Sequence, residues 1–168
     1  MVRKMDLYIL RHGKAGHSSS DPDDDRRVLT PAGRKEIRAV ARWMQAEKIS
    51  FDLIATSPLP RASETAKIVA RSLGLEDRVT SWEDLAPGGD PDSVCYAASE
   101  SGKNAVLLIG HEPDVSVLIG KIIGHGDHAS VVMAKGGLAK IRYFAFDDRH
   151  PSGTLQWLLT AKQILAMR

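Results

Sequence analysis

The sequence predicts an α/β protein: a three-layer sandwich with a mostly parallel central sheet, helices on both faces and an antiparallel edge strand. The prediction rests on short apolar runs typical of buried parallel strands, and on the helical periodicity of the segments that follow them. Strands that alternate with amphipathic helices indicate such a sheet, because both of its faces must be covered. A chain of 168 residues with 43% hydrophobic content fits one domain, spanning residues 1–168.

The parallel strands are expected at Asp6–Leu10, Phe51–Thr56 and Asn104–Gly110. A helix should follow each of them. The first begins after Thr30, a suitable N-cap followed by Pro31 at the first helical position. The second begins after Pro60 and the third after Pro113. Apolar or small residues at i, i+3, i+4 and i+7 mark the three inner faces: Ile37, Val40, Ala41 and Met44; Ala62, Thr65, Ala66 and Val69; Val115, Leu118, Ile119 and Ile122.

The sequence also predicts the remaining helix and the C-terminal strands. Gly74 is expected to end the second helix, and a short helix should cover residues 91–99. The C-terminal part differs, because residues 131–146 and 153–161 read as two strands joined by a turn at His150–Gly153. These strands would supply the antiparallel edge of the sheet.

Composition narrows the range of partners and locations. The 23 basic and 21 acidic residues are interspersed and leave a net charge of +2, so neither nucleic acid nor a membrane is an expected partner. The single cysteine, Cys95, cannot form an internal disulfide and is expected to pack on a helix. The first residues do not read as a signal peptide, and no apolar run is long enough to span a bilayer. A cytoplasmic location is therefore expected.

Basic side chains follow all three predicted parallel strands. Arg11 and His12 come after the first, Arg61 lies in the first turn of the helix after the second, and His111 comes after the third. In an open α/β sheet the ligand crevice lies beyond the carboxyl ends of the strands, so these groups should converge there. Guanidinium forks, imidazoles and helix N-termini together suit a tetrahedral dianion. The sequence therefore predicts a phosphate site.

The same residues carry a family resemblance. The segments LRHG (10–13), SPLPRASETA (57–66) and GHEP (110–113) resemble the three signature segments of the histidine phosphatase superfamily, which has the phosphoglycerate mutase-like fold. The short chain and the stretch DDDRRVLTPAGRKEI (23–37) are similar to the SixA branch of phosphohistidine phosphatases. The resemblance implies that His12 is a nucleophile that becomes transiently phosphorylated. It also implies that Arg11, Arg61 and His111 hold the phosphoryl oxygens.

These residue types suit that chemistry. A neutral imidazole attacks phosphorus well, and a covalent intermediate divides hydrolysis into two in-line transfers. Fixed cations stabilise the charge on the equatorial oxygens, so neither a metal nor another cofactor is expected. His12 must present a lone pair, whereas a bound dianion should favour the protonated form of His111. Gly13 is expected to let the backbone approach the nucleophile closely and to contribute to substrate binding.

The general acid is left open. Many relatives use a carboxylic acid between the second and third strands, where Glu83, Asp84 and Asp90 are available here. None lies in a familiar acid motif, and each also suits a solvated loop or a helix cap, Asp90 before Pro91 in particular. A leaving imidazole needs a differently placed proton, or one already on its ring, so the acid is one of these three or none.

Several other features have ordinary explanations. The HGDH segment (125–128) and the DPDDD run (21–25) contain metal-ligand residue types but are expected to face water. Arg26 and Arg27 either reach the rim of the phosphate site or pair with those aspartates. His17 and Ser18 either line the entrance or belong to a plain loop. Tryptophans are expected in packing roles: Trp43, Trp82 and Trp157.

Three functions remain open on the sequence alone. The favoured one is a phosphatase acting on phosphohistidine in proteins, with a histidine-containing phosphotransfer domain as a possible partner. The second is a phosphomonoesterase or mutase that acts on a small phosphorylated metabolite. The third is a catalytically idle phosphate-binding module, although binding alone does not require an imidazole directed at phosphorus. The lack of sequence for a lid favours a protein substrate, which needs an open approach.

Overall fold

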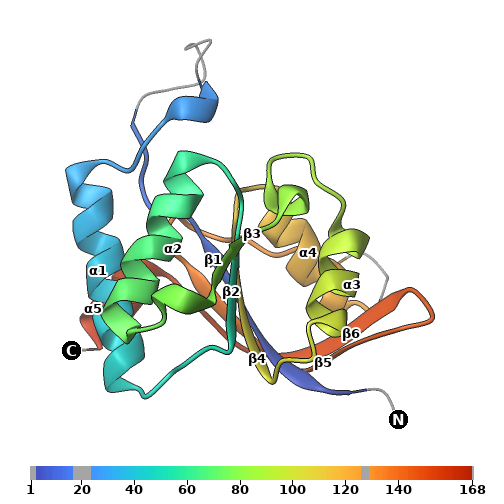
Figure 1. Cartoon of the computed structure of the whole chain (residues 1–168). Coiled ribbons are helices and arrows are strands. Elements are labelled where there is room, and N and C mark those ends of the chain that lie inside the picture. Colours follow the sequence, from blue (N-terminus) through green and yellow to red (C-terminus); the bar gives the residue numbers. More distant parts are fainter. Residues whose placement is uncertain (1–2, 17–23, 126–128, 168) are drawn as a thin grey trace.

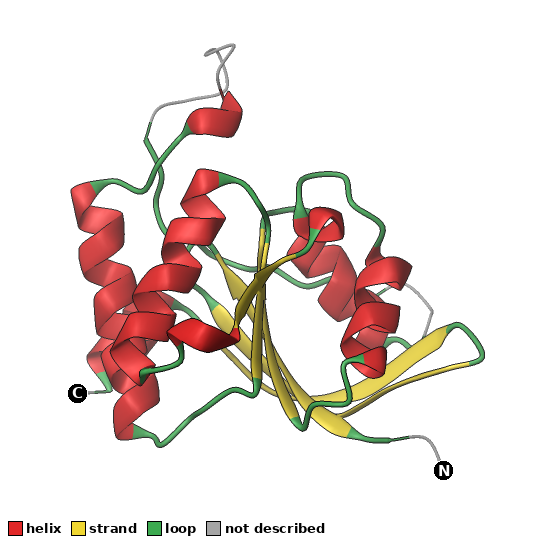
Figure 2. Ribbon diagram, in the orientation of Figure 1, coloured by secondary structure: helices red, strands yellow, loops and turns green. Residues whose placement is uncertain are grey.

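The computed structural model describes residues 3–16, 24–125 and 129–167. A six-stranded sheet in the order β3-β2-β4-β1-β5-β6 forms the middle layer (Figures 1 and 2). The strands β3, β2, β4 and β1 are parallel, whereas β5 is antiparallel to both β1 and β6. The strands are β1 (Met5–Arg11), β2 (Leu53–Thr56), β3 (Val79–Ser81), β4 (Ala105–Gly110), β5 (Leu138–Asp147) and β6 (His150–Leu159).

Helices cover both faces of the sheet, and together they give the predicted three layers (Figure 2). Their bounds are α1 (Pro31–Ala46), α2 (Pro60–Leu73), α3 (Pro91–Glu100), α4 (Asp114–Ile123) and α5 (Ala161–Ala166), with short 3₁₀ turns η1 (Asp24–Arg26), η2 (Glu76–Arg78) and η3 (Glu83–Leu85). Among the described residues, none of these helices has the length and apolar character needed to cross a bilayer.

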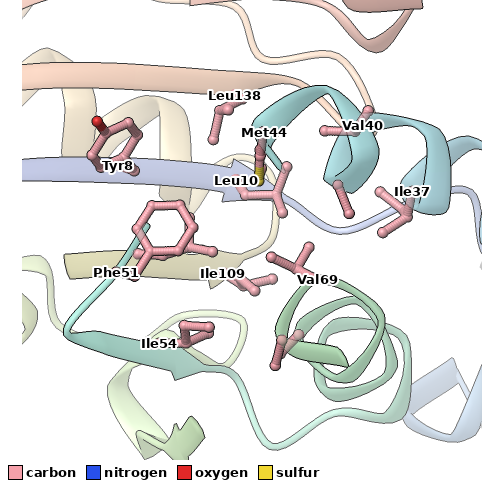
Figure 3. Packing of buried hydrophobic residues seen from close by; sticks show 14 of the residues in the cluster. Tyr8, Leu10, Ile37, Val40, Met44, Phe51, Ile54, Val69, Ile109 and Leu138 are labelled. Atoms are coloured by element: carbon pink, nitrogen blue, oxygen red, sulfur yellow. The ribbon is translucent and has the colours of Figure 1, made fainter. Parts of the chain in front are cut away.

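The alternation of side chains along the parallel strands divides the core into two clusters. Tyr8 and Leu10 of β1 face α1, α2 and α5, and Figure 3 shows their packing. Leu7 and Ile9 point to the opposite face, where α3 and α4 pack. All of the residues predicted for the three helix inner faces are buried. The period of two along the strands and the period of 3.6 along the helices therefore predicted correctly which side of each element is buried.

The predicted end signals of α1 and α2 are confirmed, although α2 begins at Pro60 itself rather than after it. Thr30 caps α1, because its hydroxyl accepts a hydrogen bond from the Gly33 N–H. Gly74 ends α2 in the left-handed conformation, with φ of 68°. Asp90 caps α3 by accepting hydrogen bonds from the Asp92 and Ser93 N–H groups.

Cys95 packs in the core on α3, and burial raises the pKa of its thiol to about 12.

The C-terminal hairpin differs from the prediction. The first strand begins at Leu138 rather than at residue 131, and the turn lies at Asp148 and Arg149, which both have positive φ. Pro151 and Gly153, which were expected in the turn, lie inside β6. Pro151 is tolerated because β6 is the edge strand. Gly153 is required there because an added Cβ would come within 2.5 Å of the Ile141 side chain.

One strand was not predicted. β3 (Val79–Ser81) is short, lies at the parallel edge of the sheet and pairs only with β2. The tryptophans have the expected packing roles. Trp43 and Trp157 meet edge to face with ring centroids 5.9 Å apart, and Trp82 packs partly buried against the cluster under α3 and α4.

Candidate active site

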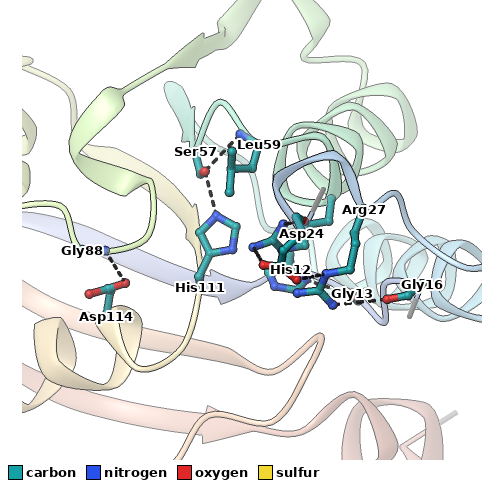
Figure 4. A network of polar contacts seen from close by, with 11 residues as sticks. His12, Gly13, Gly16, Asp24, Arg27, Ser57, Leu59, Gly88, His111 and Asp114 are labelled. Carbon is teal, nitrogen blue, oxygen red and sulfur yellow. Dashed lines mark hydrogen bonds and ion pairs between the residues drawn. The ribbon is translucent and has the colours of Figure 1, made fainter. Parts of the chain in front are cut away.

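The carboxyl ends of the central strands bring the predicted basic residues together. In the β1–β4 pair Arg11 lies opposite Gly110, and the His12 N–H donates to the Gly110 carbonyl at 3.1 Å. His111 follows directly, so the His12 and His111 rings lie side by side with centroids 5.0 Å apart. Arg61 enters from the N-terminus of α2, which follows the neighbouring strand β2. The predicted convergence is thus present, and Figure 4 shows the two histidines.

His12 is held in one tautomer. Its Nδ1 lies 2.7 Å from the Gly13 carbonyl oxygen. A carbonyl can only accept, so Nδ1 carries the proton and donates it, which leaves a lone pair on Nε2. The pKa of His12 is lowered to about 4, mainly by burial and also by the charges of Arg61, Arg11 and Arg27, against the opposing effect of the Gly13 hydrogen bond. In the free protein His12 is therefore a neutral imidazole with an available nucleophilic nitrogen.

His111 is positioned by a residue that was not singled out from the sequence. Its Nε2 lies 2.7 Å from the Ser57 Oγ, and this oxygen accepts a hydrogen bond from the Leu59 N–H at 3.2 Å. The Nδ1 of His111 is buried and has no partner among the described residues. When the Ser57 hydroxyl donates to Nε2, Nδ1 is the protonated nitrogen and can donate to an anion. The available signal was the position of Ser57, immediately after β2 and at the start of SPLPRASETA.

The pKa of His111 is lowered to about 3, first by burial and then by His12 and the nearby arginines. The expected preference for its protonated form applies to the dianion-bound site. In the free protein, no carboxylate of the described residues offsets the effect of burial on this ring, and both histidines are neutral at pH 7. His12 is 6% exposed and His111 only 2%.

The two predicted arginines are each fixed at one end and have a free N–H at the other. Arg11 donates from Nη1 to the Met133 carbonyl at 2.9 Å, and Arg61 donates from Nη1 to the Asp24 carbonyl at 3.1 Å. In each, Nε is buried without a hydrogen-bond partner among the described residues. Burial lowers the pKa of both guanidinium groups, yet arginine keeps its charge in proteins. Within the described part of the chain, the site therefore contains cationic donors without partners, which an oxyanion would satisfy.

Arg27 both pairs with an aspartate and lies close to the phosphate site, the two alternatives that the sequence left open. Its Nε lies 2.6 Å from an Asp24 carboxylate oxygen, and its Nη1 donates to the Gly16 carbonyl at 3.2 Å. Its charge also lowers the pKa of both His12 and His111, so it acts on the centre of the site. Figure 4 shows Arg27 and Asp24 beside His12. Arg27 is thus a third cationic side chain close to the two histidines.

Close packing explains why residue 13 is a glycine. An added Cβ would lie 2.7 Å from Cγ1 of Ile37 on α1, so a side chain here would displace the loop that carries His12. The Gly13 N–H donates to the Thr65 hydroxyl at 3.2 Å, and that hydroxyl donates to the Arg61 carbonyl at 2.7 Å. This chain of hydrogen bonds ties the loop after β1 to the helix that carries Arg61.

The three candidate acids lie in different settings. Asp90 is exposed, and its hydrogen bonds to Ser93 and Asp92 as the cap of α3 lower its pKa, which makes it a poor proton donor. Glu83 is exposed on η3. Asp84 lines a cavity of about 30 Å³ together with His111 and Asp114. Asp114, which was not predicted, accepts a hydrogen bond from the Gly88 N–H at 3.1 Å.

The remaining predicted features lie at the margin of the site or outside the described residues. His17 and Ser18 fall outside them, as do most of HGDH and residues 21–23 of the DPDDD run. His125 is exposed, as expected for a loop. Asp24 approaches Arg61 as well as Arg27, with 3.9 Å between its Oδ2 and the Arg61 Nη2. In the described parts of the chain, no cluster of His, Cys, Asp or Glu could hold a metal ion.

Similar proteins show to which family this arrangement belongs. A family model for the histidine phosphatase superfamily (branch 1) matches residues 7–86. The phosphohistidine phosphatase SixA of Escherichia coli (strain K12) is 31% identical over 70% of this chain and 74% of its own length. The chain belongs to the histidine phosphatase superfamily. An uncharacterized protein of Picosynechococcus sp. is 30% identical over 92% of this chain and 99% of its own length.

The fold of this histidine phosphatase agrees with the family. A solved structure of the protein histidine phosphatase SixA, complexed with tungstate, matches it with a TM-score of 0.80 and 26% identity, over 94% of this chain and 98% of that one. These matches confirm the family, the SixA branch and the α/β fold expected from the three signature segments. The family model ends before His111, and the match to the SixA structure extends over nearly the whole chain.

Proposed function

We propose that this histidine phosphatase removes the phosphoryl group from phosphohistidine in proteins, through a covalent intermediate on His12. The observation that carries the proposal is the hydrogen bond from His12 Nδ1 to the Gly13 carbonyl. It leaves the lone pair of Nε2 free, close enough to Arg11, Arg27 and Arg61 for their charges to lower the pKa of His12. A group that only bound phosphate would not need a nucleophilic nitrogen there.

In the first step the phosphoryl oxygens accept hydrogen bonds from Arg11, Arg61 and the Nδ1–H of His111. Nε2 of His12 attacks phosphorus, so that an N–P bond forms while the P–N bond of the substrate breaks. The leaving imidazole takes the electron pair and departs as a neutral ring when its other nitrogen already carries a proton. The buried donors stabilise the equatorial oxygens in the transition state, because they need no reorganisation.

In the second step water attacks the phosphohistidine. A new O–P bond forms, the Nε2–P bond breaks, and its electron pair returns to Nε2. One water proton passes to solvent, and inorganic phosphate leaves. The Gly13 carbonyl keeps the proton on Nδ1 during both steps, so His12 returns to its original tautomer.

A protein substrate fits what surrounds the site. In the described part of the chain, β2 connects to β4 through α2, β3, η3 and α3, without a long insertion that could enclose a small metabolite. A phosphorylated side chain on a folded partner needs such an open approach. A histidine-containing phosphotransfer domain has this form. The relative SixA of Escherichia coli is a phosphohistidine phosphatase, and a solved SixA structure contains tungstate, a tetrahedral oxyanion like phosphate; both support the same chemistry for this chain.

One observation favours a second candidate, a phosphomonoesterase for small metabolites. Asp84 and Asp114 line the same cavity as His111. A carboxylic acid close to the site could protonate an oxygen leaving group, which an imidazole leaving group does not require. Specificity constants separate the two candidates. The proposal predicts a higher kcat/KM for a phosphohistidine protein than for a sugar phosphate or phosphoglycerate, and the reverse order would favour the second candidate.

The covalent step is tested with His12→Gln. We expect the variant to lose turnover while it keeps its circular dichroism spectrum, and the parent to form an acid-labile, base-stable phosphoenzyme with labelled substrate. His150→Gln is the matched control, because His150 is exposed at the start of β6, in the hairpin away from the site. Undiminished turnover in His12→Gln would show that the nucleophile is another group.

A further inference from the structure

A strongly basic groove lies on the outer surface between α1 and α2, which run side by side in Figure 1. Its volume is about 330 Å³. Four of its lining residues are cationic and one is acidic. They come from two turns of α1 and three turns of α2: Arg34, Arg38, Glu64, Lys67, Ile68, Arg71 and Ser72.

Most of this positive charge is not neutralised by other residues that the structure describes. Glu64 forms an ion pair with Arg34 and accepts a hydrogen bond from the Leu29 N–H at 3.0 Å. Arg38, Lys67 and Arg71 are exposed, and none of the three forms an ion pair with another described residue. The whole chain has a net charge of only +2, so the groove is more positive than the rest of the protein, where acidic and basic residues nearly cancel.

The groove begins next to the candidate active site. Arg61 lies in the first turn of α2, and Glu64, Lys67 and Arg71 lie on the following turns. A rise of 1.5 Å per residue places Arg71 about 15 Å from Arg61 along the helix. A partner whose phosphorylated side chain reaches Arg61 therefore has a neighbouring surface within reach of the groove.

We propose that this groove docks an acidic helix of the phosphorylated protein substrate, an inference that rests on the proposed function. A third helix fits between two neighbouring helices, because side-chain ridges pack into helix grooves. Carboxylates spaced i and i+4 on that helix match Lys67 and Arg71, which have the same spacing.

The lining residues favour an acidic protein over other anionic partners. No aromatic residue lines the groove, so nucleic-acid bases have nothing to stack on. Ile68 is its only apolar lining residue and is partly buried, so the groove offers no side chain for insertion into a membrane. Attraction between opposite charges would instead speed the encounter and orient the substrate, and salt would weaken this effect.

The groove is tested with two helical phosphohistidine peptides that differ only in having glutamate or glutamine beside the phosphohistidine. For the parent protein at low salt, we expect kcat/KM to be about tenfold higher for the glutamate peptide. The triple variant Arg38→Glu, Lys67→Glu, Arg71→Glu should lose this preference, as should the parent at high salt. Turnover of free phosphohistidine should be the same in both proteins, because none of the three residues belongs to the active site.

A control variant reverses three exposed lysines outside the groove: Lys48, Lys103 and Lys162. It changes the net charge by the same amount and should keep the peptide preference. A triple groove variant that still prefers the glutamate peptide would overturn the proposal. The same holds if the control variant loses the preference equally, because net charge alone would then explain it.

Failure of the proposed function would be visible separately. If the parent hydrolyses neither the phosphohistidine peptides nor free phosphohistidine, the proposed activity is wrong. Fluorescence anisotropy with the unphosphorylated glutamate peptide then still tests the groove, since binding should require Arg38, Lys67 and Arg71. Tighter groove-dependent binding of a DNA oligonucleotide, or of phosphatidylserine–phosphatidylcholine vesicles, would overturn the assignment to an acidic protein.

Discussion

Acidification should destabilise this protein through His12 and His111, well above the pH at which most carboxylates titrate. Both rings are buried, and their folded-state pKa values of about 4 and about 3 lie below the ordinary value of 6.5. Each ring therefore binds fewer protons in the folded state than in the unfolded state. Stability must then fall as pH drops below about 6.5, and each contribution levels off below the folded-state pKa.

The size of the effect follows from these values. At pH 5 an unfolded histidine is almost fully protonated, whereas both folded rings are almost fully neutral. The difference corresponds to a loss of about 2 kcal/mol for each histidine between pH 7 and pH 5, or about 4 kcal/mol for the pair. Such a loss is a large part of the stability of an ordinary domain, about 5–15 kcal/mol.

The assay is urea unfolding at pH 7 and pH 5 for the parent, His12→Gln, His111→Gln and the double variant. Each single variant should lose about 2 kcal/mol less than the parent on acidification, whatever its stability at pH 7. Other titrating groups are common to all four proteins and cancel in the comparison. An equal loss in the parent and the double variant, or imidazole NMR signals that titrate near pH 6.5, would refute the reasoning.

Three further predictions concern neighbouring groups. Ser57→Ala should lower kcat about tenfold in steady-state assays, because His111 loses the hydrogen bond that orients it. Gly13→Ala should cost about 1–3 kcal/mol of unfolding free energy, and less in an Ile37→Ala background, as a double-mutant cycle in urea would show. Arg27→Gln should raise the pKa of His111 in an NMR titration, because a positive charge that opposes protonation is removed.

Local patterns were sufficient to predict most of the fold. Each parallel strand and each large helix has a clear hydrophobic period, and Thr30 and Gly74 supply end signals that depend only on neighbouring residues. The short strand β3 carries no such pattern, because its three residues gain strand geometry from pairing with β2. The hairpin turn was misplaced because Gly153 was read as a turn residue, although tertiary packing against Ile141 requires it within a strand.

The candidate site also contains residues that local sequence rules predict and residues that only long-range contacts explain. Arg11, His12 and His111 follow strand ends and Arg61 begins a helix, so the general rule for α/β sheets was enough to bring them together. The roles of Ser57 and Arg27 depend on contacts between segments distant in the sequence. The folded loops place the Ser57 hydroxyl near His111 and the Arg27 charge near His12. Neither proximity could be predicted from the residues next to Ser57 or Arg27 in the sequence.

In the proposed mechanism the two histidines have different roles, although both are neutral in the free protein. Three arginines create a positive potential that, together with burial, opposes protonation of either ring. For His12 this is an advantage, because protonation at Nε2 would remove the nucleophile. In the proposed mechanism a bound phosphoryl dianion favours a second proton on His111, so that Nδ1–H donates to a phosphoryl oxygen and Nε2–H donates to the Ser57 hydroxyl oxygen. The proposal therefore has the substrate supply the charge that turns His111 from a neutral into a cationic donor, while the Gly13 carbonyl keeps the proton of His12 on Nδ1.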